Sequence, residues 1–138
     1  MTTVEIRTVS GSSLAVGSSG PRTVTIDRTK ESGGLGLGFN GGELLLLAIG
    51  GCYSNDIFRE AGKRNLSVKS VKVEVHADWA GDPVRAQNVS FDVSVEADAS
   101  EAEILELIQH TDRVAEIPNS LRFGTEVKLG EIKAIEGR

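Results

Sequence analysis

Polar and apolar residues alternate in several short stretches of this chain, which is the pattern of half-buried strands. The first stretch covers residues 4–9, and two more short apolar stretches follow around 14–16 and 23–27. Turn-forming glycines and serines at 10–13 and 17–21 separate the three. The N-terminal segment is therefore predicted to form an antiparallel meander of three strands.

Alternation returns in the second half of the chain. Residues 68–79 place valines on one face, the turn sequence GDPV follows, and residues 89–95 repeat the pattern. This arrangement predicts an antiparallel hairpin. A last strand is predicted around Val127 and Leu129, with Ile132 beyond a glycine that suits a bulge.

Two other stretches carry helical signals. Asn40 stands three residues before Glu43, a spacing typical of a capping box, and the helix that it opens is predicted to end at residues 61–65, AGKRN. The first half of this helix is apolar on nearly every side, which predicts burial on several sides. Ser100 precedes a second helix with one apolar stripe, which Pro118 is expected to end or kink.

The resulting order is βββ-α-ββ-α-β, an α+β arrangement in a single domain over residues 1–134. Six short strands from a chain of 138 residues offer little cover for a long helix that is apolar on all sides. We therefore expect a second copy of the chain to supply the missing cover, in a homodimer. The last four residues, IEGR (135–138), match a protease recognition sequence used beside purification tags and are given no functional weight.

Composition and charge exclude several classes of protein. The net charge is -5 and the basic residues form no cluster, so no nucleic-acid partner is expected. No stretch of about 20 apolar residues is present to span a membrane, and the opening MTTVEIRTVSG lacks the apolar core of a signal peptide. One cysteine cannot form an internal disulfide, so nothing indicates an oxidising compartment. The expectation is a soluble cytoplasmic protein with no membrane partner.

The one cysteine, Cys52, has two interpretations. Free cysteines are among the most buried residues and commonly pack as small apolar side chains. A reactive cysteine needs a positive charge or a helix N-terminus nearby, and Cys52 lies more than two turns into its predicted helix. The preceding Gly50 and Gly51 each cost about 1 kcal/mol of helix stability relative to alanine. That cost indicates a particular geometry beside Cys52, either a helix break or the close approach of another backbone.

Other motifs point to no further chemistry. The glycine-rich residues 31–40 lack the Gly-Lys-Ser/Thr ending of a phosphate-binding loop and the G-x-G-x-x-G spacing of a dinucleotide site, so they are interpreted as a connecting loop. His76 and His110 have no cysteine or carboxylate at ligand spacing. The G-x-S-x-G elbow of serine hydrolases is absent. Neither a metal nor a cofactor is expected.

The segment NGGELLLLAIGGC (40–52) resembles the start of the central helix in the OsmC/Ohr family, which comprises osmotically inducible proteins and organic hydroperoxide resistance proteins. Residues 66–79 resemble the strand that follows that helix. IPNS (117–120) and GTEVKLG (124–130) resemble the family's Cys-Pro-x-Ser segment and last strand. The similarity extends over residues 33–129, and the expected order of elements agrees with it.

The resemblance implies an OsmC-like domain in an intertwined homodimer, with two buried central helices and active sites at the dimer interface. In this family the first cysteine attacks the O–O bond of an organic hydroperoxide and becomes a sulfenic acid. A second cysteine resolves it to a disulfide, which a dithiol reduces, while an arginine and a glutamate hold the first cysteine as thiolate. Cys52 matches the peroxide-attacking position.

The partners of that cysteine are not matched. Ile117 stands where the resolving cysteine is expected, and Gly42 where the supporting glutamate is expected. The neighbouring Glu43 is interpreted as the helix cap. The N-terminal part of the chain offers three arginines, none of them in a matching motif: Arg7, Arg22 and Arg28.

Functions of different classes remain open at this point. In the first, Cys52 reduces organic hydroperoxides and an external thiol reductant resolves the sulfenic acid, because an internal resolving cysteine is missing. In the second, the protein is a non-catalytic dimer that binds a small apolar ligand, with Cys52 lining the site. A third alternative is redox sensing, in which modification of Cys52 alters the dimer.

Overall fold

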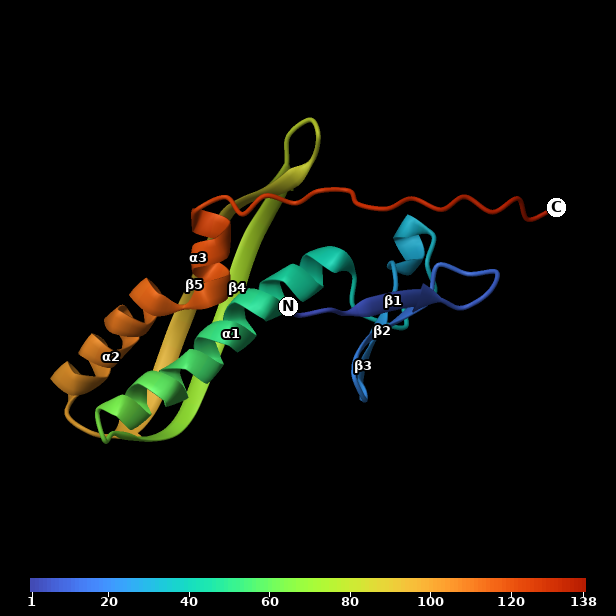
Figure 1. Ribbon diagram of the computed structural model, residues 1–138. Helices are drawn as coiled ribbons and strands as arrows, with labels where there is room; N and C mark the ends of the chain where they lie inside the picture. The colour runs from blue at the N-terminus through green and yellow to red at the C-terminus, as the bar shows by residue number, and fades with distance from the viewer.

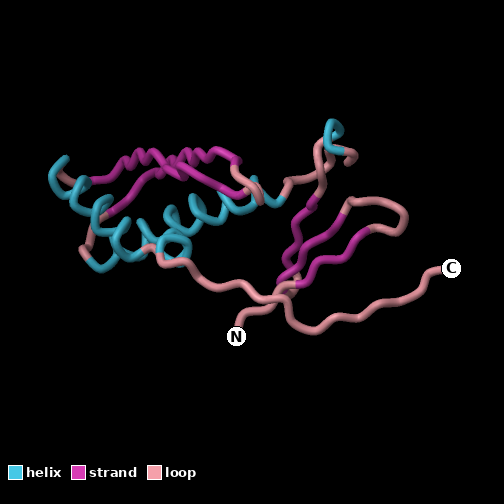
Figure 2. The backbone as a smooth tube through the Cα atoms, turned by 90° about the horizontal axis from the view of Figure 1, so that it is seen from above, coloured by secondary structure: helices cyan, strands magenta, loops and turns pink.

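The computed structural model describes all residues, 1–138, and confirms an α+β fold (Figure 1). Strands β1 (Glu5–Thr8), β2 (Ala15–Ser19) and β3 (Arg22–Ile26) pair antiparallel in the order β1-β2-β3. The predicted N-terminal meander is therefore confirmed. This small sheet lies beside the rest of the fold, beyond the first turns of the central helix (Figures 1 and 2).

The glycine-rich segment connects β3 to the central helix through a short 3₁₀ turn, η1 (Lys30–Ser32). The buried carboxylate of Asp27 organises this loop. It accepts hydrogen bonds from the backbone N–H groups of Arg28, Leu35 and Leu37 at 2.8–3.2 Å and from the Ser13 hydroxyl at 3.1 Å. The loop amides thus already bind an anion that belongs to the chain itself.

The central helix, α1 (Gly41–Lys63), begins at the predicted capping box. Asn40 Oδ1 accepts from the Glu43 N–H at 2.8 Å, and Glu43 Oε1 accepts from the Asn40 N–H at 3.0 Å. Two donors that helix geometry leaves unpaired are satisfied in this way. None of the helices, α1 included, combines the length and apolar composition that crossing a membrane requires.

The two glycines before Cys52 do not break α1, so the expected helix break is wrong. The nearest neighbour at Gly50 is a side chain and not the expected backbone: an added Cβ would lie 3.0 Å from Cγ2 of Val75. At Gly51 an added Cβ would meet no atom of the chain within 4 Å. Gly50 therefore lets α1 pack closely on β4 (Ser67–Ala80). Within the single chain, no neighbouring atom explains a glycine at position 51.

Strands β4 (Ser67–Ala80) and β5 (Arg85–Asp98) form the predicted antiparallel hairpin. The helices α1 and α2 (Glu101–Val114) cover one face of it, and Figure 2 shows the strands on one side and the helices on the other. The core between these two layers is small. Its fully packed members come from α1, α2 and the residue that follows α2: Tyr53, Ile57, Ala61, Leu107 and Ala115.

The end of the chain differs from the prediction in two ways. Pro118 does not end α2; the helix stops at Val114 because Ala115 is extended, and Pro118 lies in the first turn of α3 (Glu116–Arg122), where proline is tolerated. The strand predicted at Val127 and Leu129 is not formed. Residues 125–138 run as an extended segment away from the hairpin (Figure 1), and a strand cannot form without a neighbouring strand edge to bond.

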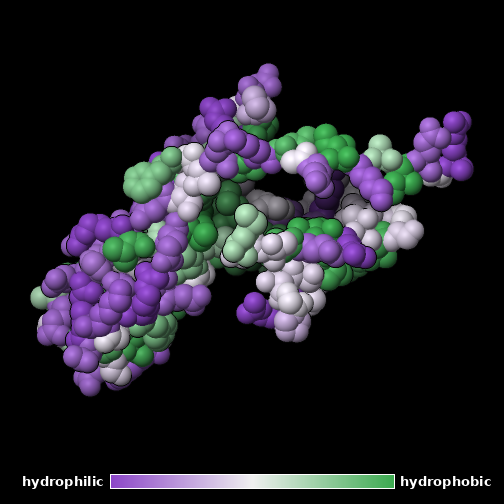
Figure 3. All heavy atoms as spheres, viewed as in Figure 1, coloured by the Kyte–Doolittle hydropathy of each residue, from purple (hydrophilic) through white to green (hydrophobic).

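Much apolar surface stays uncovered in the single chain. Only 14 of 138 residues are buried, far fewer than a domain of this size normally buries. The predicted burial of α1 on several sides is not reached, since Leu47 and Phe58 are 51% and 50% exposed. Figure 3 shows apolar surface over the middle of α1, the N-terminal sheet and the extended C-terminal segment.

Candidate functional site

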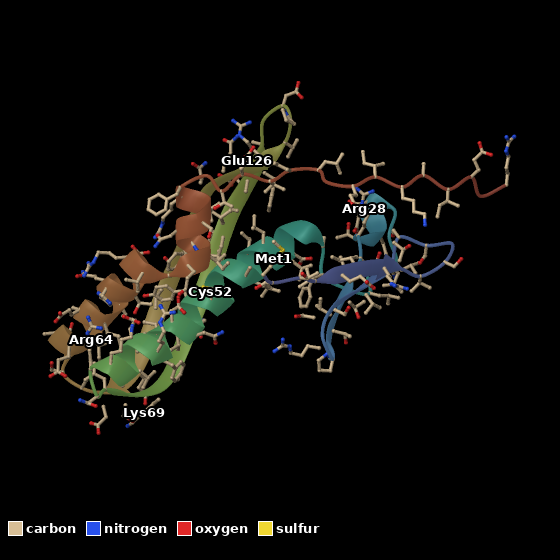
Figure 4. All side chains as sticks on the ribbon, in the orientation of Figure 1. Met1, Arg28, Cys52, Arg64, Lys69 and Glu126 are labelled. Atoms are coloured by element: carbon tan, nitrogen blue, oxygen red, sulfur yellow. The ribbon has the colours of Figure 1, made fainter.

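Cys52 lies in the middle of α1, where α3 packs against this helix (Figure 4). Its side chain is partly exposed. This placement differs from that of a core cysteine, because a small reagent can reach the sulfur. It also differs from a surface cysteine, because neighbouring side chains surround the sulfur on several sides.

The residue at the expected resolving position does lie against Cys52. The backbone N–H of Ile117, in the first turn of α3, lowers the pKa of the Cys52 thiol. An isoleucine side chain has no thiol chemistry. What Ile117 contributes is a backbone donor, which stabilises negative charge on the sulfur.

Two carboxylates also contact the sulfur. Asp56, one helical turn after Cys52 and only 6% exposed, places Oδ2 3.6 Å from Sγ. Glu116, the first residue of α3, places Oε2 3.7 Å from Sγ. Both distances suit a hydrogen bond from a thiol, whose donor atom is large. The thiol thus has two proton acceptors in its own chain.

Arg59 joins these carboxylates and is itself held by a buried glutamate. Its guanidinium bonds Asp56 and Glu116 through Nη1, and its Nε lies 2.9 Å from Oε2 of Glu60. Glu60 is 3% exposed and also binds Lys63 at 3.0 Å and His110 at 2.8 Å. Hydrogen bonds from Arg59, Lys63 and His110 lower the pKa of Glu60 to about 2, so it is ionised at neutral pH.

The electrostatics keep Cys52 protonated in the single chain. Burial raises the pKa of the Cys52 thiol, the Ile117 N–H opposes this, and the charges of Asp56 and Glu116 raise the pKa further. Burial likewise raises the pKa of Asp56, although Arg59 opposes the shift. Arg59 lowers the pKa of Glu116 by its hydrogen bond. At neutral pH the arrangement is a thiol beside carboxylates.

The arginines and the glycine singled out in the sequence lie elsewhere. Arg7 pairs with Glu5, and Arg28 lies on the N-terminal unit far from Cys52 (Figure 4). Arg22 begins β3, in the same sheet. At Gly42 an added Cβ would lie 2.8 Å from Cζ2 of Trp79, so this position has no room for a glutamate while the indole stays in place.

An apolar cavity is lined by residues that are close in sequence to Cys52 and Ile117. It measures about 340 Å³ and lies between α1, β5 and α3. Ile49, one turn before Cys52, and Pro118, next to Ile117, are among its lining residues, whereas Cys52 itself is not. We call it the α1–α3 cavity. Its other lining residues are Leu45, Ala86, Val89, Phe91, Leu121 and Arg122.

One group of donors at the site is of a kind that metals bind. The ligand atoms of Cys52, Asp56 and Glu116 lie within 4.8 Å of one another, and zinc accepts thiolate and carboxylate ligands. Arg59 already bonds one oxygen of each carboxylate. A metal would have to compete with that guanidinium, so the donor set fits an ion pair better than a metal centre.

The fold and this site define an OsmC-like domain. The family model described as OsmC-like protein matches residues 33–130, and the chain belongs to this family. No curated protein sequence matches the chain. An OsmC-like protein from Mycoplasma pneumoniae superposes with a TM-score of 0.77 at 18% identity, covering 91% of this chain and 89% of that one.

Two further structures carry names that refer to peroxides. The organic hydroperoxide resistance protein OhrB of Bacillus subtilis has a TM-score of 0.62 at 15% identity, covering 90% of this chain and 92% of that one. A putative organic hydroperoxide resistance protein of Vibrio cholerae, with captopril bound in one of its active sites, has a TM-score of 0.58 at 20% identity, covering 91% and 85%. At these identities the likeness establishes the shared fold.

Proposed function

We propose that this protein reduces organic hydroperoxides, with Cys52 as the attacking thiol and an external thiol as the reductant. The observation that carries the proposal is the setting of Cys52: it is partly exposed, and two carboxylate proton acceptors lie beside its sulfur. Residues close to Cys52 and Ile117 in sequence also line an apolar cavity. Membership of the OsmC-like family and the names of structural relatives support the proposal.

The chemistry needs two stages. The sulfur attacks the terminal oxygen of the hydroperoxide, the O–O bond breaks, and Cys52 becomes a sulfenic acid while an alcohol leaves. An external thiol then displaces water from the sulfenic acid to give a mixed disulfide, and a second thiol releases Cys52 as the thiol. The external thiol is required because the chain has one cysteine.

The α1–α3 cavity suits the organic part of such a substrate. Its lining is aliphatic and aromatic apart from Arg122, and its volume of about 340 Å³ fits a small organic hydroperoxide. Ile49 and Pro118 connect its wall to the residues around Cys52. We therefore assign the apolar tail of the peroxide to this cavity.

We also propose that the functional unit is a homodimer. Leu47, Gly51 and Phe58 recur at helical spacing along the exposed side of α1, and the extended C-terminal segment leaves Val127 and Leu129 open to solvent. The second copy would cover this side of α1. The expected intertwined arrangement and the placement of active sites at the interface belong to the same proposal.

One observation favours a second function, which is binding without catalysis. The raised pKa of Cys52 disfavours the thiolate that attacks peroxides, and the apolar cavity persists whether or not the thiol reacts. In that case the protein binds a small apolar ligand, and Cys52 is one of the groups near it.

A reaction with cumene hydroperoxide separates the two functions. We expect the reduced protein to gain one oxygen within minutes by intact mass, and to gain the mass of dimedone instead when this sulfenic-acid trap is present. The variant Cys52→Ser is the control and should gain neither. If Cys52 stays a thiol over this time while an apolar fluorescent probe binds the cavity, the peroxidase proposal fails and ligand binding is supported.

A further inference from the structure

Each of the two carboxylates at Cys52 bonds Arg59 with one oxygen and faces the sulfur with the other. Arg59 Nη1 lies 3.2 Å from Oδ1 of Asp56 and 2.6 Å from Oε1 of Glu116. The second oxygens, Oδ2 and Oε2, are the ones that lie 3.6 and 3.7 Å from Sγ of Cys52. One guanidinium therefore holds both carboxylates so that the free oxygen of each faces the sulfur.

We propose that Asp56 and Glu116 carry the proton of Cys52 during peroxide reduction, and that Arg59 is the residue that positions them. The proposal rests on the proposed function above. As the sulfur attacks, its proton moves to one of the carboxylates, the O–O bond breaks, and the same proton passes to the leaving alkoxide. The sulfur loses two electrons and the peroxide gains them, so the products are a sulfenic acid and an alcohol.

The groups around the sulfur make such a carrier necessary. Asp56 of α1 and Glu116 of α3 contact it, and Arg59 of α1 bonds both carboxylates. His110 of α2 bonds Glu60, the other partner of Arg59. Because burial and both carboxylates disfavour the thiolate, the resting state is the thiol. A thiol attacks well only when a base removes its proton in the same step, and the alkoxide leaves well only when an acid supplies one.

Arg59 is suited to a positioning role because its own place is fixed. Its Nε bonds Oε2 of Glu60 at 2.9 Å, and Glu60 is buried and bound by two further cations, Lys63 and His110. Only the Nη1 end is left for the carboxylates at the sulfur. A planar, fixed guanidinium restricts both acceptors more than a flexible ammonium group does.

Two reagents distinguish proton transfer from a simple charge effect. Iodoacetamide releases iodide, which needs no proton, whereas cumene hydroperoxide releases an alkoxide that needs one. In the double variant Asp56→Asn, Glu116→Gln, we expect oxidation by the hydroperoxide at neutral pH to slow by about 10²-fold or more. Alkylation should become faster, because removal of two negative charges lowers the pKa of the thiol. The exposed Glu106→Gln on α2 is the control.

The outcomes separate this assignment from the proposed function. If both rates rise, or neither changes, while the wild type reduces peroxide, the carboxylates are not proton carriers and only this assignment is overturned. If the wild type fails to react, the proposed function falls and the assignment with it. If the double variant unfolds, the single variant Glu116→Gln replaces it, because it changes an exposed side chain and should stay folded. Its oxidation should slow and its alkylation should become faster, each by a smaller factor than in the double variant.

The role of Arg59 is tested by a pH profile. Arg59 lowers the pKa values of both carboxylates by its charge and hydrogen bonds. In Arg59→Gln the carboxylates should therefore lose their protons at higher pH, and the acid side of the oxidation rate profile should move to higher pH. Arg59→Lys keeps the charge and should restore most of the profile. A purely structural role would lower the rate at every pH without moving the profile, and that result would overturn the positioning role.

Discussion

Gly50 and Gly51 are adjacent in α1 but have different surroundings, so alanine at each should have a different effect. A methyl group at Gly50 would press on Val75, whereas a methyl group at Gly51 would meet no atom of its own chain within 4 Å. In an isolated chain, Gly51→Ala should raise the free energy of unfolding by about 1 kcal/mol through helix propensity. Gly51 shares the exposed side of α1 with Leu47 and Phe58, however, where we place the second copy.

We therefore expect Gly51→Ala to weaken the homodimer. A methyl group forced into a well-packed contact typically costs about 1–3 kcal/mol. The helix-propensity gain is present in both the folded monomer and the dimer, so it cancels in the dissociation equilibrium. The dissociation constant should consequently rise by about 5- to 150-fold. Small residues at such contacts let two helices approach closely, which is the role that we assign to Gly51.

Sedimentation over a series of protein concentrations measures the dissociation constant, and urea unfolding at two concentrations measures stability. Gly50→Ala is the matched control, because it should lower stability by overpacking against Val75 without changing association. A Gly51→Ala protein that is about 1 kcal/mol more stable and associates as the wild type does would refute our reasoning. Gly51 would then face water, and the interface would lie on another surface.

Three further predictions concern the framework around the site. Glu60→Gln should lower the free energy of unfolding by about 1–3 kcal/mol at neutral pH. The pKa of Glu60 is about 2 in the folded protein, against an ordinary value of 4.5. In urea melts, the difference in stability from wild type should therefore be full above pH 4.5 and shrink as pH falls toward 2. Asp27→Asn should speed proteolysis of the glycine-rich loop at neutral pH, with the exposed Asp98→Asn as control, and equal cleavage would contradict the role of Asp27. Burial raises the pKa of Asp27, but its backbone donors lower it overall. Protection of the wild-type loop should therefore be lost as pH falls through that lowered pKa. Gly42→Ala should displace Trp79, the one tryptophan, and shift its fluorescence maximum; an unchanged spectrum would show that the indole is not fixed there.

The parts of the fold that depend on residues close together in the sequence were predictable. The capping pair Asn40 and Glu43 interacts across three positions, and its geometry follows from the spacing alone. Alternation along β4 and β5 likewise fixed the hairpin, because side chains on a strand alternate between faces. The strand expected at Val127 and Leu129 failed because strand formation depends on a partner edge, which alternation within one segment does not reveal.

The site was predictable only in part. The resemblance pointed to Cys52 and Ile117, and the Ile117 N–H lowers the pKa of the Cys52 thiol. Asp56 follows Cys52 by four residues in a predicted helix, a spacing that puts both on one face, so this partner could have been found. Glu116 is 64 positions from Cys52, and its approach depends on how α3 packs on α1. The role of Arg59 depends on Glu116, which only the packing of α3 brings to α1, so its spacing in the sequence did not indicate it.

The contact between Gly42 and Trp79 has a consequence for how this chain can change over evolutionary time. The indole occupies the space that any larger side chain at position 42 would need, so a single substitution to glutamate there would meet a steric barrier before it could offer a carboxylate. A glutamate at position 42 would therefore have to displace the indole or follow a replacement of Trp79, 37 residues away. Descendants of this sequence would thus more readily refine the acidic pair at Cys52 than recover a glutamate at position 42.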